Sequence, residues 1–154
     1  MKLFSKSETV AVLVILFFVA FVSFFNYKQA LLRGRDNERK NDLSDIKNGL
    51  ENYHAKYNVY PQTLDSLSEF MKVLPKDPST PSGRSYLYLS DGHFFQIFAS
   101  LEDKNDSEYN FAIDRRGLRC GNFICNFGKS DGQTPLDKTL QEYENELYAK
   151  KKKK

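Results

Sequence analysis

A long apolar run near the start of the chain is the feature that most limits how it can fold. Val10 to Phe25 contains 16 residues, and Ser23 is its one polar member. A helix rises about 1.5 Å per residue, so the run spans roughly 25 Å, against about 30 Å for the hydrocarbon core of a bilayer. We therefore predict a transmembrane helix over residues 9–26, with residues 1–8 as a short N-terminal flank.

Two other interpretations of this run were weighed against an uncleaved anchor. A removable secretory signal has a basic start, which Lys2 and Lys6 supply, but it also needs small residues just before the cut. Phe24 and Phe25 stand there instead. A buried helix of a soluble domain is the remaining alternative. The uncleaved anchor is the favoured interpretation.

Composition indicates that a small soluble domain follows the run. Only 40% of the 154 residues are hydrophobic, and 28% are charged. The formal charge of +3 depends on the run Lys150–Lys154, because the rest of the chain carries −2. No basic nucleic-acid-binding surface is therefore expected, and nucleic acid is not among the predicted partners.

Two signals disagree about the side of the membrane on which this domain lies. The basic residues between Lys28 and Lys40 favour a cytoplasmic domain, because lysine and arginine mark the cytoplasmic flank of a span. Cys120 and Cys125 enclose the short segment CGNFIC, and such a pair favours a disulfide in an oxidising, extracytoplasmic space. Two reduced thiols are the alternative interpretation of the cysteines.

The helix is predicted to continue well beyond the apolar run, from about Thr9 to Tyr57. Asn58 can end it in a left-handed conformation, and Pro61 prevents its continuation. The stretch from Gly34 to Asp42 holds no apolar residue and is expected to be a solvated neck. Beyond it, apolar residues recur at spacings of three and four, which predicts a stripe that packs on a sheet. The stripe consists of Leu43, Ile46, Leu50, Tyr53 and Tyr57.

Residues 61–134 are predicted to form a globular head with a three-stranded antiparallel sheet. Thr63 is expected to begin a second, shorter helix with Leu64, Leu67, Phe70 and Met71 on its apolar face. Asp91-Gly92 lies between two β-prone runs and predicts a hairpin, because both residues tolerate positive φ. A third strand is expected within residues 109–117. With residues 27–60 as the soluble continuation of the long helix, the predicted fold class is α+β.

Residues 135–154 are predicted to form an amphipathic helix followed by a lysine tail. Leu136, Leu140, Tyr143 and Leu147 lie at helical spacing. The lysines complement the dipole at the helix C-terminus. A solvated end is the favoured interpretation of the lysine run, with contact to anionic lipid or wall polymer as the alternative.

The chain has no recognisable catalytic motif, and we expect neither an enzyme nor a cofactor. His54 and His93 are interpreted as surface residues, and they lie too far from the cysteines in sequence to suggest a metal site. The acidic segment Glu102–Glu108 is interpreted as a solvated loop, with calcium binding as the alternative. Tyr86 and Tyr88 are expected on the sheet surface, with ligand contact as their alternative.

Several features in this order resemble the type IV pilin superfamily, including the pseudopilins of type II secretion. They are a short basic leader, Phe4, Glu8, the apolar run and one long helix that leads into a small antiparallel sheet. The exit at Tyr60-Pro61, the segment LPKDP at residues 74–78 and the tyrosine-rich hairpin are also similar to the pseudopilin branch. The resemblance covers roughly residues 4–117. The family carries Gly immediately before the Phe, where its peptidase cuts, whereas this sequence has Leu3.

The resemblance implies a structural subunit of a type IV pilus or a pseudopilus, polymerised through its apolar helix with other pilin-like subunits. Phe4 and Glu8 would then act in subunit assembly, with the Glu8 carboxylate meeting the charged N-terminus of a neighbour. The alternative is that Glu8 caps the start of its own helix. Residues expected in the membrane or filament core are Val10, Leu13, Ile15, Phe17, Phe18 and Phe21.

These features together predict a single-pass membrane protein with an extracytoplasmic C-terminal domain, extracellular once it assembles. A monomeric, membrane-anchored binding module with a pilin-like fold is the alternative function.

Overall fold

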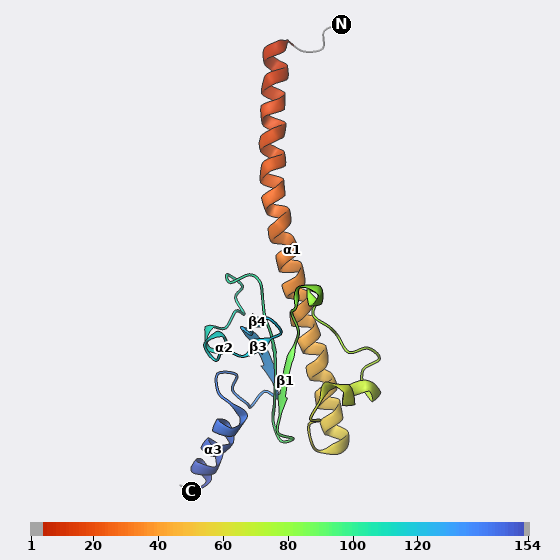
Figure 1. Cartoon of the computed structure of the whole chain (residues 1–154), viewed down its shortest axis with the longest axis vertical. Helices are drawn as coiled ribbons and strands as arrows, with labels where there is room; N and C mark the ends of the chain where they lie inside the picture. The colour runs from red at the N-terminus through yellow and green to blue at the C-terminus, as the bar shows by residue number, and fades with distance from the viewer. Residues whose placement is uncertain (1–4, 153–154) are drawn as a thin grey trace. The chain divides into compact units, whose positions relative to one another are not determined.

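The computed structural model describes residues 5–152, and the chain divides into two compact units between Gly34 and Arg35. The fold class is α+β, as predicted, with one long N-terminal helix and a small antiparallel sheet of three strands. The helices and strands are labelled in Figure 1. They are α1 (Lys6–Tyr57), the 3-10 helices η1 (Leu64–Glu69) and η2 (Thr80–Ser82), β1 (Leu87–Ser90), β2 (Phe95–Ala99), α2 (Phe111–Arg115), β3 (Arg119–Cys120), β4 (Phe123–Ile124), β5 (Phe127–Ser130) and α3 (Leu140–Lys151).

The long helix α1 ends at Tyr57, as the sequence predicted. Asn58 follows with a φ of 58°, and its N–H donates to the carbonyl of His54 at 2.7 Å. This left-handed residue satisfies one of the carbonyls that a helix end leaves open. The start of the helix differs from the prediction by three residues, because α1 begins at Lys6 and not at Thr9.

The predicted hairpin is confirmed, with β1 and β2 paired antiparallel and Ser90 opposite Phe95. Its loop has four residues, Asp91 to Phe94. The Asp91 carboxylate accepts hydrogen bonds from the backbone N–H groups of His93 and Phe94, at 2.9 and 2.7 Å. Gly92 has a φ of 91°, a conformation that glycine adopts without strain.

The third strand is not where the sequence placed it. Residues 111–115 form the short helix α2, because the Asn110 side chain accepts from the N–H groups of Ala112 and Ile113 and so caps a helix. The third strand is β5, which pairs antiparallel with β2 and leaves β2 in the centre of the sheet. A Cβ at Gly128 of β5 would lie 2.6 Å from Cδ1 of Phe98, so only glycine fits at this crossing of the two strands.

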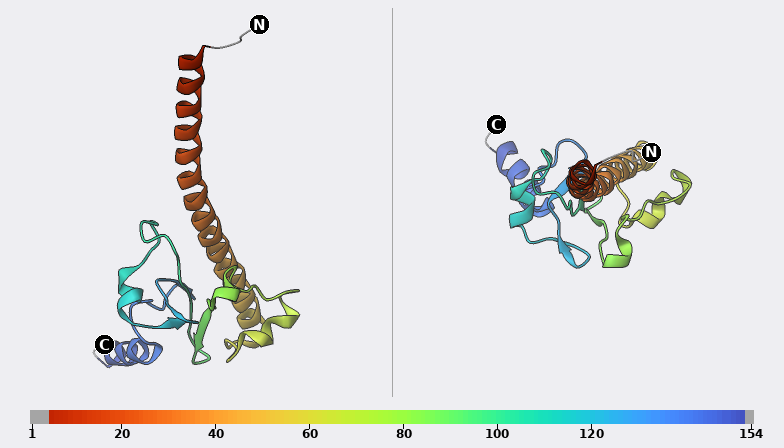
Figure 2. Two further views of the ribbon diagram at one scale, coloured as in Figure 1. Left: turned by 45° about the horizontal axis from the view of Figure 1, so that its top comes forward. Right: turned by 90° about the horizontal axis from the view of Figure 1, so that it is seen from above.

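The predicted second α-helix is a 3-10 helix, η1, that ends at Glu69. Thr63 does occupy its N-cap, but the threonine side chain makes no capping hydrogen bond. Leu67 is buried in the core, while Leu64 and Met71 are partly buried and pack against it. Both views of Figure 2 show this segment beside the last turns of α1. Leu64, Leu67 and Met71 therefore face the core as expected, but the 3-10 helix is too short to include Phe70 and Met71.

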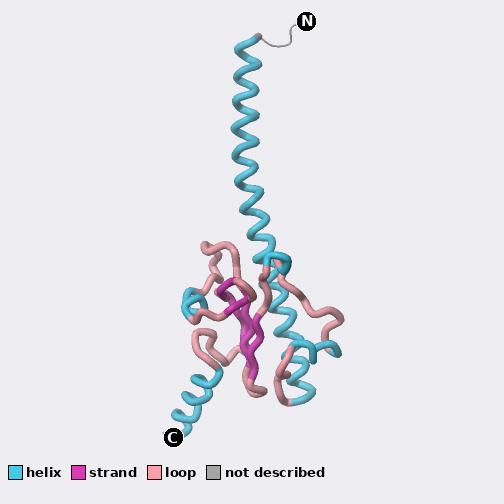
Figure 3. The backbone as a smooth tube through the Cα atoms, viewed as in Figure 1, coloured by secondary structure: helices cyan, strands magenta, loops and turns pink. Residues whose placement is uncertain are grey.

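The main core lies between the second half of α1 and one face of the sheet (Figure 3). Leu43, Ile46 and Leu50 of the predicted stripe are fully buried there, and Tyr53 packs against them. The predicted stripe is one residue too long, because Tyr57 is 45% exposed. Its ring packs against Tyr53 and Phe70, and its hydroxyl donates to Glu69 at 2.9 Å. The partners of the stripe on the sheet include Phe95, Ile97 and Ala99.

A second, smaller core brings the cysteines together with Phe98 and Ile113. Since side chains alternate along a strand, Phe98 of β2 lies in this core while Phe95, Ile97 and Ala99 lie in the main one. The central strand is therefore buried along its whole length.

Candidate functional site

The apolar segment, residues 10–25, is exposed in the isolated chain at every residue whose side chain the structure describes. The six residues predicted for a membrane or filament core are all exposed, from 53% at Phe21 to 72% at Phe17. Burying one large apolar side chain stabilises a protein by about 1.5–3 kcal/mol, so such a surface requires a covering. Within the described residues, one helix is long and apolar enough to cross a membrane, and it is the one that contains this segment.

Glu8 caps the helix in which it lies. Its carboxylate accepts a hydrogen bond from the backbone N–H of Ser5 at 2.7 Å, and the Ser5 hydroxyl accepts from the N–H of Glu8 at 3.3 Å. This reciprocal pair is a capping box, which satisfies two N–H groups that a helix start leaves open. Phe4, the other residue predicted for assembly, lies outside the described residues.

The capping box was readable from the sequence and was missed. Ser5-Lys6-Ser7-Glu8 has the S-x-x-E pattern that marks a helix start, and it places the start three residues earlier than Thr9. The predicted alternative for Glu8, a cap on its own helix, therefore describes the isolated chain. The cap uses one carboxylate oxygen, Oε2.

A cluster of buried charges lies where the sequence predicted a solvated neck. Arg39 and Asp36 of α1 are both fully buried. Nε of Arg39 donates to Asp77 at 2.8 Å, and its Nη1 donates to Asp36 at 2.6 Å. Nη2 donates to Asp77, to the Ser79 hydroxyl and to Glu102, at 3.1, 2.9 and 2.9 Å. The prediction of a solvated neck was therefore wrong, because folded segments far along the chain supply partners for these charges.

The remaining contacts of this Arg39 cluster tie two loops to α1. The Asp36 carboxylate accepts from the backbone N–H groups of Glu102 and Asp103, at distances from 2.8 to 3.1 Å. Arg35 makes a bidentate pair with Glu102, in which both distances are 2.8 Å. Paired geometry of this kind is stronger than a single hydrogen bond. The cluster thus holds the loops around residues 77 and 102 to the helix.

These contacts keep both partners charged. The hydrogen bonds from Arg35, together with those from Arg39, hold the pKa of Glu102 at about 2, although burial acts in the opposite direction. Burial disfavours the charged form of Arg39, but its bonds to Asp77, Glu102 and Asp36 outweigh this effect and raise the pKa of the guanidinium. In the described part of the chain every buried side-chain nitrogen and oxygen has a hydrogen-bond partner. The Arg39 cluster is therefore complete and leaves no buried polar atom for a ligand.

The acidic segment 102–108 is also engaged by cations of the head itself. Lys40 lies 2.6 Å from the Asp106 carboxylate and 2.8 Å from that of Glu108. Glu102 is held by the two arginines. Across residues 5–152, no group of three or more His, Cys, Asp or Glu side chains is arranged to hold a metal ion.

The two hairpin tyrosines face inward, which corrects their predicted place on the sheet surface. Tyr86 donates to the Asp42 carboxylate, and Tyr88 donates to the carbonyl of Pro61 at 2.7 Å. Both pack against the main core, and burial raises the pKa of Tyr88 to about 12. Their hydroxyls therefore join the sheet to α1 and to the segment that follows it.

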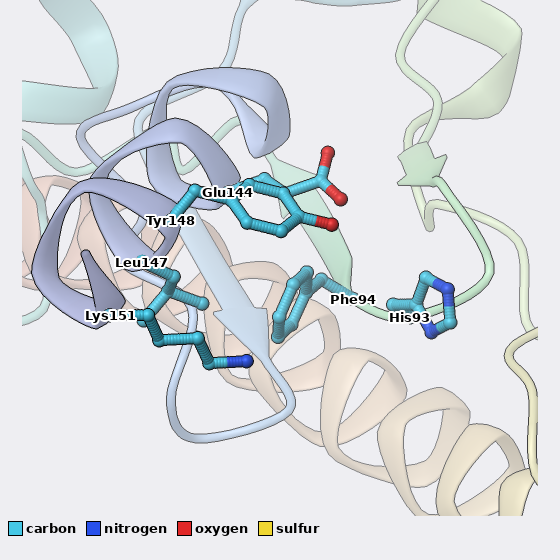
Figure 4. A pocket seen from close by; sticks show the side chains of 6 residues that line it. All are labelled: His93, Phe94, Glu144, Leu147, Tyr148 and Lys151. Carbon is cyan, nitrogen blue, oxygen red and sulfur yellow. The ribbon is translucent and has the colours of Figure 1, made fainter.

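The remaining candidate residues occupy separate places. Cys120 and Cys125 are joined in a disulfide and are fully buried. The His54 ring stacks on Tyr60 with centroids 4.5 Å apart. His93 lines a hollow of about 350 Å³ between the hairpin loop and α3, shown in Figure 4. The structure therefore does not bring the two histidines and the cysteines together into one site.

Comparisons with protein-family models, with curated proteins and with solved structures found no match to this chain. The fold is that of an α+β protein whose long N-terminal helix packs on a small antiparallel sheet, with a disulfide in the head. This architecture is compatible with a pilin-like fold.

Proposed function

We propose that this protein is a structural subunit that is anchored in a membrane by residues 9–26 and assembles through that helix into a type IV pilin-like filament. The observation that carries the proposal is the exposure of the apolar segment, whose most apolar 18-residue window contains no buried residue. In the membrane, lipid covers this surface. In a filament, the corresponding helices of neighbouring copies cover it.

A helix that lies first in lipid and then among neighbouring helices needs apolar side chains around its whole circumference. Val10, Leu13 and Phe17 share one face and are 60%, 60% and 72% exposed. On the opposite side, Ile15, Leu16 and Val19 are 62%, 58% and 56% exposed. A helix that is hydrophobic all round is one that is buried on every side in its working state. Lipid contact and filament packing place the same demand on these residues.

Glu8 is the residue on which assembly would depend. A carboxylate in an apolar surrounding is tolerable only beside a positive charge or strong donors. Its Oε2 accepts from Ser5 within the same chain. In a filament the charged N-terminus of a neighbouring subunit would approach the carboxylate and set the register between subunits.

The buried disulfide supports a head on the extracytoplasmic side, because disulfides persist in oxidising compartments. The basic residues that follow the span favour the opposite side. We give the disulfide more weight because a cysteine pair in a reducing cytosol would remain as thiols.

A pair of variants tests the assembly role of Glu8. Glu8→Gln removes the charge but keeps an oxygen that can accept from Ser5. Ser5→Ala removes the hydroxyl half of the capping box but keeps the charge. Filaments sheared from cells are expected for the wild type and for Ser5→Ala, and to be lost for Glu8→Gln. Equal filament yields from both variants, or none from the wild type, would contradict the proposal.

The mass of the N-terminal peptide gives a second test. Processing before Phe4 would create the charged amine that the Glu8 pairing requires, so a chain that begins at Phe4 is the expected result. A chain that retains Met1 in the membrane would remove that partner and favour the second candidate.

The second candidate is a monomeric, membrane-anchored binding module. It is favoured by one observation, the capping box, because Glu8 already has a hydrogen-bond partner in its own chain. If the protein is such a binding module, it should sediment as a monomer in mild detergent and be absent from sheared filaments.

A further inference from the structure

The last helix of the chain is only half docked on the head. α3 begins with a capping box between Thr139 and Glu142, and its Tyr143 ring packs edge-on against Phe94, with centroids 5.2 Å apart. No residue of α3 is fully buried. The helix is therefore well formed and leaves much of its surface uncovered.

The uncovered side of α3 combines apolar side chains with lysines. The hollow of about 350 Å³ (the α3 hollow) is lined by His93 and Phe94 from the hairpin loop and by Glu144, Leu147, Tyr148 and Lys151 from α3. Figure 4 shows the four α3 side chains on one side of the hollow and the hairpin residues on the other. Tyr148 is 59% exposed at its rim. One carboxylate, that of Glu144, lies among these residues.

The sequence of α3 runs into five successive lysines, 150–154. Lys150 and Lys151 lie in the last turn of α3, and both are exposed, as is Lys152 at its C-cap. The helix dipole favours cations only in the last turn, so it explains two of the five. Within residues 5–152, none of these three lysines forms an ion pair, whereas Lys40, Lys56 and Lys138 do.

We infer that the end of α3, with the α3 hollow and the lysine run, is a docking surface for an anionic phospholipid bilayer. The charges are complementary, because the lysine run carries +5 and the rest of the chain −2, which concentrates positive charge at one place. Tyrosine and lysine together are typical of segments that sit at the level of lipid headgroups. Phosphate groups would meet the lysines, while Tyr148, Leu147 and Phe94 would contact the upper part of the acyl chains.

The apolar part of this surface favours a bilayer over a soluble polyanion. A polyanion such as polyphosphate has no apolar surface to cover the exposed ring of Tyr148 or the partly exposed side chain of Leu147. A bilayer gains from both, since burial of apolar surface and attraction to anionic lipid add for a segment that lies in the interface.

The test uses the full chain held by its anchor in nanodiscs of phosphatidylcholine, so that the anchor itself is occupied. Sedimentable vesicles of phosphatidylcholine, with or without phosphatidylglycerol, are added and the bound fraction is measured. Binding is expected only to the vesicles that contain phosphatidylglycerol, and it should fall as salt is raised. Each lysine near an anionic surface strengthens binding about fivefold, so Lys150→Gln, Lys151→Gln and Lys152→Gln together should weaken it roughly 100-fold.

Matched controls separate this surface from general positive charge. Lys72→Gln, Lys76→Gln and Lys104→Gln change the net charge of the chain by the same amount elsewhere on the head and should leave vesicle binding unchanged. Tyr148→Ser should weaken binding severalfold, whereas Val73→Ser, at a residue that is 75% exposed, should not.

Three results would overturn the inference. Binding to vesicles that is independent of phosphatidylglycerol would exclude a charge-based surface. Equal losses from the two lysine triples would exclude the end of α3 as its location. Competition by soluble polyphosphate, with no effect of Tyr148→Ser, would identify a soluble polyanion as the occupant in place of a bilayer.

Discussion

The two halves of helix α1 differ in which side chains are exposed and which are buried. In the first half, large apolar side chains such as Phe17 and Phe18 are 72% and 67% exposed. In the second half, the charged residues Asp36 and Arg39 are fully buried beside Leu43 and Ile46. Apolar residues are usually buried, but in the first half they are exposed. Charged residues are usually exposed, but in the second half two of them are buried.

This contrast indicates that the head supplies packing partners for the second half of α1, whereas the first half has none within the described chain. Arg39 can be buried because the carboxylates of Asp77 and Glu102 and the Ser79 hydroxyl of the head surround it, together with Asp36 of α1. The apolar segment has nothing comparable within the described chain, where none of the residues in its most apolar stretch is buried. The proposed function supplies the missing partner, first as lipid and then as neighbouring helices.

The largest expected effect comes from removing the centre of the buried charges. Arg39→Met would leave the buried carboxylates of Asp36 and Asp77 without their cation, whereas Glu102 would keep its pair with Arg35. Breaking such a cluster costs about 3–5 kcal/mol of unfolding free energy. Arg115→Met, at an exposed arginine of α2, is the matched control and should change it by less than about 0.5 kcal/mol. Denaturant unfolding of the full chain in detergent measures both, and equal small effects would show that the cluster does not stabilise the head.

Two isoleucines on the same helix test the contrast in apolar packing. Ile46 is fully buried, whereas Ile15 is 62% exposed. Ile46→Ala should lower the unfolding free energy of the head by about 3 kcal/mol, because it removes buried methyl groups and leaves a cavity. Ile15→Ala should leave head stability within about 0.5 kcal/mol of the wild type. A similar loss from both substitutions would mean that the apolar segment packs inside a folded unit, contrary to the structure.

Acid should lower the unfolding free energy of the head, because it protonates Glu102 and breaks its ion pairs with α1. The pKa of Glu102 is about 2 in the folded head, against its ordinary value of 4.5. Its ion pairs therefore stabilise the head fully above about pH 4.5, and this contribution, about 3 kcal/mol, is lost as the pH falls towards 2. Unfolding free energies measured across this range should decline less steeply for Glu102→Gln than for the wild type. Parallel curves for the two proteins would contradict the assignment.

The disulfide should contribute less than the buried charges. Cys120 and Cys125 close a loop with a sequence separation of 5, and a loop this short stabilises by about 2 kcal/mol through the unfolded state. Cys120→Ala with Cys125→Ala should lower the unfolding free energy by that amount. Reduction of the wild type should give the same loss. A reductant that changes nothing, with both thiols already open to alkylation, would contradict the bond.

The smallest effect is expected at the start of α1. Ser5→Ala removes one half of the capping box, which is worth about 1 kcal/mol. Backbone amides of the first turn should then exchange with solvent about fivefold faster, while those of the head stay unchanged. Ser23→Ala, in the middle of the apolar segment, is the control and should not alter exchange in the first turn. Unchanged exchange in Ser5→Ala would show that the cap does not hold the helix start.

Local patterns predicted the elements whose cause is local. The 3-4 spacing from Leu43 to Tyr53 and the Asp91-Gly92 turn identified the core face of α1 and the hairpin. The S-x-x-E pattern at Ser5 carried the true helix start in the same way. The third strand could not be found by such signals, because β5 has no apolar alternation and Gly128 is fixed by its contact with Phe98.

The buried charges could not be predicted because their cause is distant. Arg39 meets Asp77 and Glu102 at sequence separations of 38 and 63 residues. In the sequence, the stretch from Gly34 to Asp42 has the polar composition of a solvent-exposed helix. Only the folded positions of the two loops make burial of these charges favourable.

The most direct test of the account labels two introduced cysteines from outside intact cells with a membrane-impermeant maleimide. The wild type should stay unlabelled, because its two cysteines are bonded to each other. Arg115→Cys should be labelled in intact cells, and Val14→Cys should be labelled only after the membrane is dissolved. Labelling of Arg115→Cys only after lysis would place the head in the cytosol, and labelling of Val14→Cys in intact cells would place the apolar segment in water. Either result would contradict the proposed anchored subunit.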